Sequence, residues 1–352
     1  MSGDSSSRFF CRGLMMLCFC AVGFGLGVQS AHAVTIDWVT VGDPGNTADD
    51  TGYGAVADAF QIGKYEVTIG QYAEFLNAVA ATDTYSLYTP NMSTWLNTAG
   101  ISQSGVSGSY SYAAIGPSGV TPPGASSPVN RPISYVSWFD AARMANWLHN
   151  GQGSGSTETG AYTLNGMTSG TAPAVNPGAK FFVPTESQWY KAAFYRGGST
   201  SAGYWDYATQ SNTAPGNTIG NAANQANYNA SRQTVTQSTS YSTSQNYLTE
   251  VGTFTASPSA YGTFDQSGNL REWTDSTGAA DEFRAYRGGY WNNDALLIST
   301  LSRHATGASL ENGSIGFRLA APAAVPEPST YCMALAGLAC GGYLVRRRRK
   351  RA

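Results

Sequence analysis

The sequence has 352 residues and a formal net charge of −2, and that length allows one large domain or two of ordinary size. Residues 34–324 hold 12 basic and 20 acidic side chains, a formal charge of −8. Because nucleic-acid binding needs clustered Lys and Arg, this balance excludes nucleic acid as a partner. It suits divalent cations and neutral polar ligands better.

Residues 1–33 have the pattern of a secretory signal peptide. Arg8 and Arg12 precede an apolar run at 14–28, and an Ala-His-Ala cleavage site ends the segment. We therefore expect the segment to direct export and to be removed. A retained membrane anchor is the alternative, but the apolar run is short for one.

Two stretches with alternating apolar residues, 34–41 and 60–66, predict short β-strands, and residues 180–184 predict another. Three capping boxes, in which a Ser or Thr is followed three residues later by Gln or Asp, predict helices. The predicted N-cap residues are Thr68, Ser137 and Thr185. Charges at two helix ends, His149 and Glu186, are explained by the helix dipole rather than by metal binding or acid catalysis.

Long polar stretches separate these elements. Residues 83–127 and 151–178 show no sustained period, and 197–259 is polar enough to remain solvated. Aromatic side chains in the first stretch either line a binding surface or fasten the loop to the core. They are Tyr85, Tyr88, Trp95, Tyr110 and Tyr112.

All of the cysteines lie near the chain ends: Cys11, Cys18, Cys20, Cys332 and Cys340. Residues 34–324 contain none. This part therefore forms no disulfide, and it offers no thiolate for nucleophilic catalysis or for binding a soft metal.

Asp265 and Glu272 lie seven residues apart, with Gly268 and Asn269 between them. Gly and Asn adopt positive φ readily, so this stretch suits a loop folded around a hard cation. The alternative is a Gly-Asn turn between two strands, with Glu272 in an ordinary ion pair.

The chain resembles the formylglycine-generating enzyme (sulfatase-modifying factor) family from about Ile36 to Ala320. The matching segments, in family order, are Tyr65–Thr68, Pro128–Asn130 leading into Ser134–Trp138, Pro184–Glu186, Gly268–Trp273, Arg287–Gly289 and Gly316–Ala320. For residues 34–324 the resemblance implies an α+β, C-type-lectin-like fold with short strands, a few helices and long loops.

The resemblance also implies calcium as a cofactor. One site would use the side chains of Asp265 and Glu272 and the carbonyl oxygens of Gly268 and Leu270. These are hard oxygen donors of the kind that calcium prefers.

A second, weaker calcium site would use Asn227 and Tyr228. The acid that should complete it is missing, because Glu250 is the sole acid in the following stretch and lies too late. Calcium sites normally need carboxylate charge to bind tightly.

The family's oxidase holds copper with two cysteines between the Arg-Gly-Gly and Gly-Phe-Arg segments. Here residues 290–315 contain no Cys, and His304 is the only nitrogen ligand there. We therefore expect no copper cofactor, since Cu(I) selects thiolates. Members resembling the iron-dependent sulfoxide synthases use a His triad, whereas residues 34–324 have only His149 and His304.

A serine hydrolase would need a partner for His304 among Asp294, Ser299 and Ser302, but no nucleophile elbow accompanies them. The resemblance instead places a ligand pocket at Trp291, Asn292, Asn293, Arg303 and His304. The alternative is that Trp291 is core and that the Asn residues form turns. Arg287 and Arg318 are expected to form structural ion pairs with Glu272, Asp275 or Asp281.

Residues 325–352 resemble the PEP-CTERM sorting signal of Gram-negative bacteria. Pro326, Glu327 and Pro328 precede an apolar stretch at 329–345 and a basic cluster at 346–351. The resemblance implies processing by an exosortase, with the apolar stretch as a transient transmembrane helix, and delivery to the envelope, the surface or the extracellular matrix. A plain tail anchor is the alternative.

These features favour an exported, calcium-stabilised, non-catalytic domain that binds exopolysaccharide or a surface protein. One alternative is an enzyme of the same family with a chemistry that needs no cysteine. Another is a purely structural component of the matrix.

Overall fold

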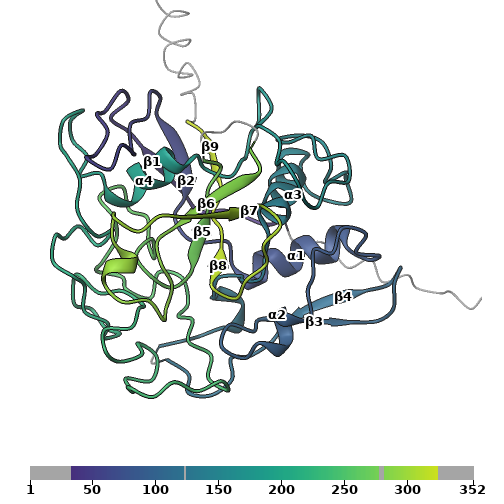
Figure 1. The fold of residues 1–352 in the computed structure, drawn as a ribbon. Coiled ribbons are helices and arrows are strands. Elements are labelled where there is room, and N and C mark those ends of the chain that lie inside the picture. Colours follow the sequence, from purple (N-terminus) through teal and green to yellow (C-terminus); the bar gives the residue numbers. More distant parts are fainter. Residues whose placement is uncertain (1–32, 123, 277–280, 324–352) are drawn as a thin grey trace, which may run out of the picture. The chain divides into compact units, whose positions relative to one another are not determined.

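The structure, a computed structural model, describes residues 33–122, 124–276 and 281–323 (Figure 1). The predicted sorting motif and its apolar stretch lie outside the described residues, as does the predicted signal peptide except for Ala33. None of the helices in the described ranges combines the length and the hydrophobicity that a membrane span requires.

A three-stranded antiparallel sheet joins the two ends of the domain. Its strands, in spatial order, are β1 (Trp38–Val41), β2 (Phe60–Gly63) and β9 (Ala320–Pro322). Ile62 of β2 pairs with Ala320 of β9. The strands at 34–41 and 60–66 are thus present, but each is shorter than the sequence predicts.

A four-stranded sheet carries the Gly-Asn stretch and its neighbours. Its strands, in spatial order, are β7 (His304–Gly307), β6 (Phe283–Arg287), β5 (Arg271–Trp273) and β8 (Ile315–Gly316). Only β5 and β8 run parallel among these pairs. Glu272 lies opposite Arg287 on one side and Gly316 on the other.

All three predicted capping boxes form, and each begins a helix. The helices are α1 (Ile69–Val79), α3 (Trp138–His149) and α4 (Glu186–Phe194). Figure 1 shows the four-stranded sheet between α4 on one side and α1 and α3 on the other. Trp273 of β5 joins the hydrophobic core that α1 and α3 share, so burial of apolar surface fixes the sheet against these helices.

The stretch at 83–127 is not the structureless loop that the sequence predicts. It contains α2 (Asn91–Thr94), β3 (Ile101–Ser104) and β4 (Ser111–Ala114), and a short 3-10 helix follows at Pro128–Asn130. The Asn77 side chain of α1 donates to the Tyr112 carbonyl (2.8 Å) and accepts from the Tyr112 amide (2.9 Å). These tertiary hydrogen bonds hold a Ser-rich hairpin whose strands have little apolar pattern of their own.

The predicted strand at 180–184 is wrong. Phe182 makes one isolated bridge, to Ala320. The amide of Val183 donates instead to the Tyr162 hydroxyl (3.0 Å), and Pro184 has no amide hydrogen to continue a ladder.

The stretch at 197–259 lacks regular helices and strands, but its side chains are not all solvated as predicted. Asn227, Asn246 and Thr249 are buried. The Asn246 side chain donates to the Ala99 carbonyl (3.0 Å), and that of Asn217 donates to the Tyr228 carbonyl (3.1 Å). Side-chain amides here satisfy backbone groups that a helix or sheet would otherwise satisfy.

Candidate functional site

Strand β5 places two charged side chains on opposite faces of the four-stranded sheet. Successive residues of a strand point to opposite faces. Glu272 is fully buried against Arg318, whereas Arg271 is partly exposed and lines a surface pocket. One short strand therefore holds both a structural ion pair and a candidate binding group.

The ion pair beneath β5 is tightly made. Nε and Nη2 of Arg318 donate to Oε2 and Oε1 of Glu272 at 2.5 and 2.7 Å, and Nε1 of Trp189 donates to Oε2 at 2.8 Å. Arg318 also donates to the carbonyls of Gly63 (3.0 Å) and Phe264 (2.8 Å). Arg318 thus pairs with Glu272, one of the partners expected from the sequence.

Two more acids lie near this pair. Glu66 accepts hydrogen bonds from the Asn269 side chain (3.0 Å) and from the Leu270 amide (3.2 Å). Its pKa is raised well above the usual value by burial and by the nearby charges of Asp265 and Glu272. Burial likewise raises the pKa of Asp265 to about 6, although the amide of Gly252 and the charge of Arg318 oppose the shift.

Side chains of the predicted first calcium site already make other contacts. Both carboxylate oxygens of Glu272 are used by Arg318, and Oδ2 of Asp265 accepts from the Gly252 amide (2.6 Å). In the ranges that the structure describes, no group of three or more His, Cys, Asp or Glu side chains is placed to hold a metal ion. The calcium site stays a prediction, for which Arg318 is a competing partner.

The predicted second calcium segment packs directly on the first. The backbone carbonyl of Asn227 accepts from the Asn269 amide (2.8 Å). The Asn227 side chain donates to the Asn269 side chain (3.0 Å). Gly268 has φ +106, and a Cβ there would lie 2.3 Å from the Asn227 carbonyl oxygen. Close backbone packing therefore explains the need for glycine at 268, whether or not a metal binds.

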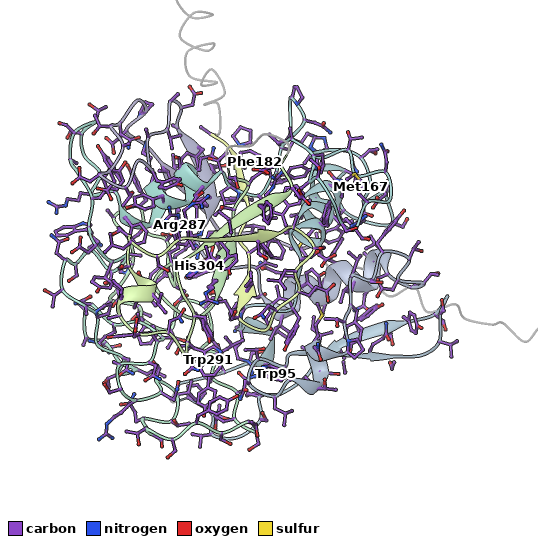
Figure 2. All side chains as sticks on the ribbon, viewed as in Figure 1. Trp95, Met167, Phe182, Arg287, Trp291 and His304 are labelled. Atoms are coloured by element: carbon purple, nitrogen blue, oxygen red, sulfur yellow. The ribbon has the colours of Figure 1, made fainter. Side chains whose placement is uncertain are left out.

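An aromatic pocket of about 380 Å³ opens on the other side of β5. Figure 2 labels two of its residues, Trp291 and Trp95, which lie at the same end of the molecule. The pocket is lined by Trp95, Asn97, Tyr135, Tyr241, Arg271, Tyr290, Trp291, Asn292, Asn312, Gly313 and Ser314. We call it the aromatic pocket.

Trp291 forms the base of a stack of aromatic rings. Its ring is 4.4 Å from that of Tyr247, with an interplanar angle of 13°. It is also nearly parallel to the ring of Tyr241, at 6.2 Å and 2°. Tyr241 is half exposed and donates its hydroxyl to the Asn97 side chain (2.5 Å). Nε1 of Trp291 is buried without a partner among the described residues.

Arg271 brings the positive charge of the aromatic pocket. It donates to the side chains of Ser314 (3.2 Å) and Asn293 (3.3 Å), and its guanidinium lies 4.6 Å from the centre of the Tyr290 ring. Nε has no partner within the described part of the chain. Burial lowers the pKa of Arg271, so a ligand that supplies acceptor oxygens would relieve the cost of this buried donor.

Of the five predicted ligand residues, only two line the aromatic pocket. Trp291 and Asn292 line the aromatic pocket, and Asn293 lies behind it, where its side-chain oxygen holds Arg271 and the Tyr290 amide. His304 of β7 stacks on Tyr286 at 5.5 Å. Burial and the charge of Arg271 lower the pKa of His304.

Arg303 points to a different place. It and Arg287 both pair with Glu186, at N–O distances of 2.9 and 2.7 Å, and both guanidinium groups approach the ring of Tyr53. Arg303 therefore does not line the aromatic pocket, and Arg287 pairs with Glu186 rather than with the acids named from the sequence. Asp275 pairs instead with Arg284 (3.1 Å).

Sequence reasoning missed Arg271, Tyr241 and Asn97 in this pocket. A signal for Arg271 was present, because a strand that buries Glu272 must point its neighbour to the opposite face. Tyr241 and Asn97 come from the long polar stretches, and no local pattern shows that these stretches meet near Trp291.

Two parts of the chain match known protein families. Residues 42–323 match the sulfatase-modifying factor enzyme 1-like domain, and residues 324–350 match the PEP-CTERM protein-sorting motif. That motif implies processing by an exosortase and export to the envelope or surface of a Gram-negative bacterium. No curated protein matches the chain.

Three solved structures are similar over most of this chain. Treponema denticola variable protein 1 is 17% identical with a TM-score of 0.49, covering 83% of this chain and 97% of its own. CarF is 21% identical with a TM-score of 0.49, covering 82% and 99%. PvdO from Pseudomonas aeruginosa is 19% identical with a TM-score of 0.41, covering 82% and 92%.

The mixed helices and small sheets confirm the predicted α+β class, and the matched domain spans most of the sequence. The chain belongs to the sulfatase-modifying factor enzyme 1-like family and carries a PEP-CTERM sorting motif at its C-terminal end.

Proposed function

We propose that this exported protein is a non-catalytic binding module whose aromatic pocket takes a glycan. The observation that carries the proposal is the pocket itself, about 380 Å³ in volume, with aromatic walls and side-chain amides from Asn292 and Asn312. Small-molecule sites typically combine aromatic walls with a few convergent polar groups.

The chemistry of the walls favours a sugar over an apolar ligand. Trp95 and Tyr241 are each 49% exposed, so each can present a flat apolar face to the C–H side of a sugar ring. Around them, Arg271 Nε and Trp291 Nε1 are donors without partners among the described residues. Sugar hydroxyl oxygens could accept from these donors, while side-chain amides both donate and accept.

The same lining argues against catalysis in the aromatic pocket. Its lining residues include no Asp, Glu, His or Cys, which supply most general acids, bases and nucleophiles. Residues 34–324 also have no thiol to hold copper. Oxidation of a cysteine-containing sulfatase peptide, followed as oxygen consumption, is therefore expected to be absent, and turnover would contradict the proposal.

A glycan array with the purified protein tests the binding function. We expect selective binding, and we expect Tyr241→Ala to lose it, because truncating an exposed aromatic anchor at a binding site costs about 2 kcal/mol or more, roughly thirtyfold in affinity. Phe283→Ala is the matched control, since Phe283 is 54% exposed and does not line the pocket. The proposal fails if no glycan binds or if both variants bind like the unchanged protein.

A further inference from the structure

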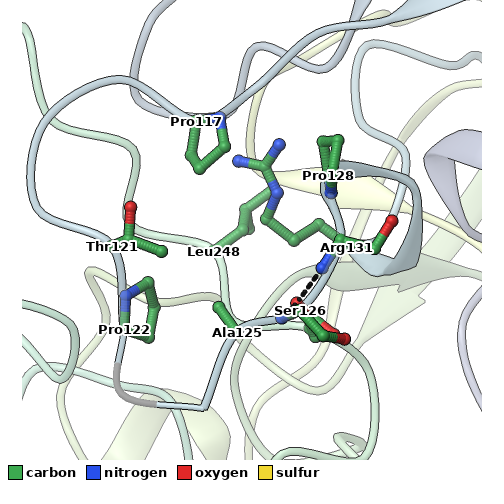
Figure 3. A pocket seen from close by; sticks show the side chains of 10 residues that line it. Pro117, Thr121, Pro122, Ala125, Ser126, Pro128, Arg131 and Leu248 are labelled. Carbon is green, nitrogen blue, oxygen red and sulfur yellow. Dashed lines mark hydrogen bonds between the residues drawn. The ribbon is translucent and has the colours of Figure 1, made fainter.

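A second, smaller pocket shares none of the lining residues of the aromatic pocket. It has a volume of about 150 Å³. Figure 3 shows its lining: Pro117, Thr121, Pro122, Ala125, Ser126, Ser127, Pro128, Arg131, Leu248 and Glu250. We call it the proline pocket.

Arg131 is the unusual member of this lining. Arg131 is only 3% exposed. Figure 3 shows its guanidinium beside Leu248 and directed toward Pro117. Nη2 donates to the Ile115 carbonyl at 3.2 Å. Nε and Nη1 are buried without a partner in the described part of the chain. A buried charged donor left unpaired is costly, so such groups normally have partners.

Glu250 lines the same pocket, but its carboxylate forms hydrogen bonds with the surrounding loop rather than with Arg131. Its carboxylate accepts from the amides of Ser126 and Ser127 and from the Asn130 side chain. No ion pair within 4.0 Å joins it to Arg131 among the described side chains. Glu250 therefore fixes the loop around the pocket and leaves the donors of Arg131 unpaired.

Arg131 keeps its charge despite this burial. Burial lowers the pKa of Arg131 to about 10, while the negative charge of Glu250 opposes the shift. At neutral pH the pocket thus contains a guanidinium ion with unpaired donors and a carboxylate that is already satisfied.

We propose that the proline pocket is a second binding site, which takes the carboxylate of a small organic acid with a short apolar stem. A guanidinium forms strong, directional hydrogen bonds with a carboxylate, and Nε and Nη1 of Arg131 are the donors available for it. The rings of Pro117 and Pro122 and the side chain of Leu248 provide apolar walls for the stem. The pocket is smaller than the aromatic pocket, about 150 against 380 Å³, which favours a small acid.

Propionate is a suitable probe, with propionamide as its neutral counterpart of the same shape. In the ¹⁵N-labelled protein, the Nε–Hε resonance of Arg131 should shift in a saturable way with propionate and at least tenfold more weakly with propionamide. Equal responses to the two compounds, or no saturable shift with propionate, would overturn the proposal.

Two variants separate binding from folding. Arg131→Gln removes the guanidinium. Ala125→Phe fills the pocket from an exposed position in its lining and leaves Arg131 in the sequence. Each should weaken propionate binding at least tenfold, measured by calorimetry, whereas the exposed-surface control Arg232→Gln should bind normally. If Ala125→Phe folds and binds as well as the unchanged protein, the ligand is not in this pocket.

Discussion

At the scale of single residues, Glu272 has two candidate charge partners, Arg318 and calcium. Family resemblance assigns it to calcium, whereas its carboxylate meets Arg318 through two hydrogen bonds of 2.5 and 2.7 Å. Both side chains are fully buried. The identity of the partner decides what holds the Gly-Asn stretch in place.

Replacing Arg318 tests the ion pair. Arg318→Met leaves Glu272 buried without its counter-charge, so we expect the free energy of unfolding to fall by about 3–5 kcal/mol. Urea denaturation measures the change. The exposed control Arg232→Met should alter stability by less than about 0.5 kcal/mol. A loss for Arg318→Met as small as that of the control would mean that Arg318 is not the main partner.

Calcium gives the complementary test at the same residue. A bound ion at about 100 times its dissociation constant would add about 2.7 kcal/mol to stability. If the predicted site binds calcium beside Arg318, the melting temperature should be higher in calcium than in chelator, and Asp265→Asn should lose the difference. Equal melting temperatures after verified calcium removal would contradict the predicted metal site.

At the scale of elements, local sequence signals place the helices that hold the sheet. The capping box of α3 is an example, because Ser137 Oγ accepts from the Asp140 amide (3.2 Å) and the Asp140 carboxylate accepts from the Ser137 amide (2.8 Å). A motif of this kind lies within four residues, so it can be recognised from the sequence without knowledge of the fold.

Removing this cap should cost measurable stability. Ser137→Ala leaves the first turn of a buried helix without its acceptor, and we expect a loss of about 1–2 kcal/mol in urea denaturation. Ser201→Ala, in an exposed turn, serves as the matched control. Equal effects of the two substitutions would show that the capping box does not stabilise α3.

Contacts between distant elements are what the sequence could not predict. The helices and the Gly-Asn stretch are predicted from local sequence patterns. Trp291 and Asn292 of the aromatic pocket are predicted from the family resemblance. Tyr241 is placed there by a hydrogen bond to Asn97, 144 residues away in sequence. The hairpin β3–β4 likewise depends on Asn77. Such contacts arise only when the whole chain packs.

At the scale of the whole molecule, buried carboxyl groups should set the pH dependence of stability. Burial raises the pKa of Asp140 to about 6, and it raises that of Asp275 to about 7, from an ordinary value of 3.8. A raised pKa means that the folded state holds the proton more tightly than the unfolded state. The stabilisation is therefore complete below the ordinary value and is lost as the pH rises through the folded values.

We thus expect the free energy of unfolding to fall between about pH 4 and pH 7. Asp140→Asn, which stays neutral at every pH, should flatten part of this decline. Urea denaturation at a series of pH values measures both. A stability that rises over this range would contradict the expected contribution of these acids.

The most direct test of the account is the affinity of one array-identified glycan for the unchanged protein and for Arg271→Gln, measured by titration calorimetry. Arg271 contributes the charged donor of the aromatic pocket, and its Nε has no partner among the described residues. We predict at least a tenfold loss of affinity in the variant, about 1.4 kcal/mol, with the melting temperature little changed. Equal affinity would contradict the claim that this pocket binds the glycan.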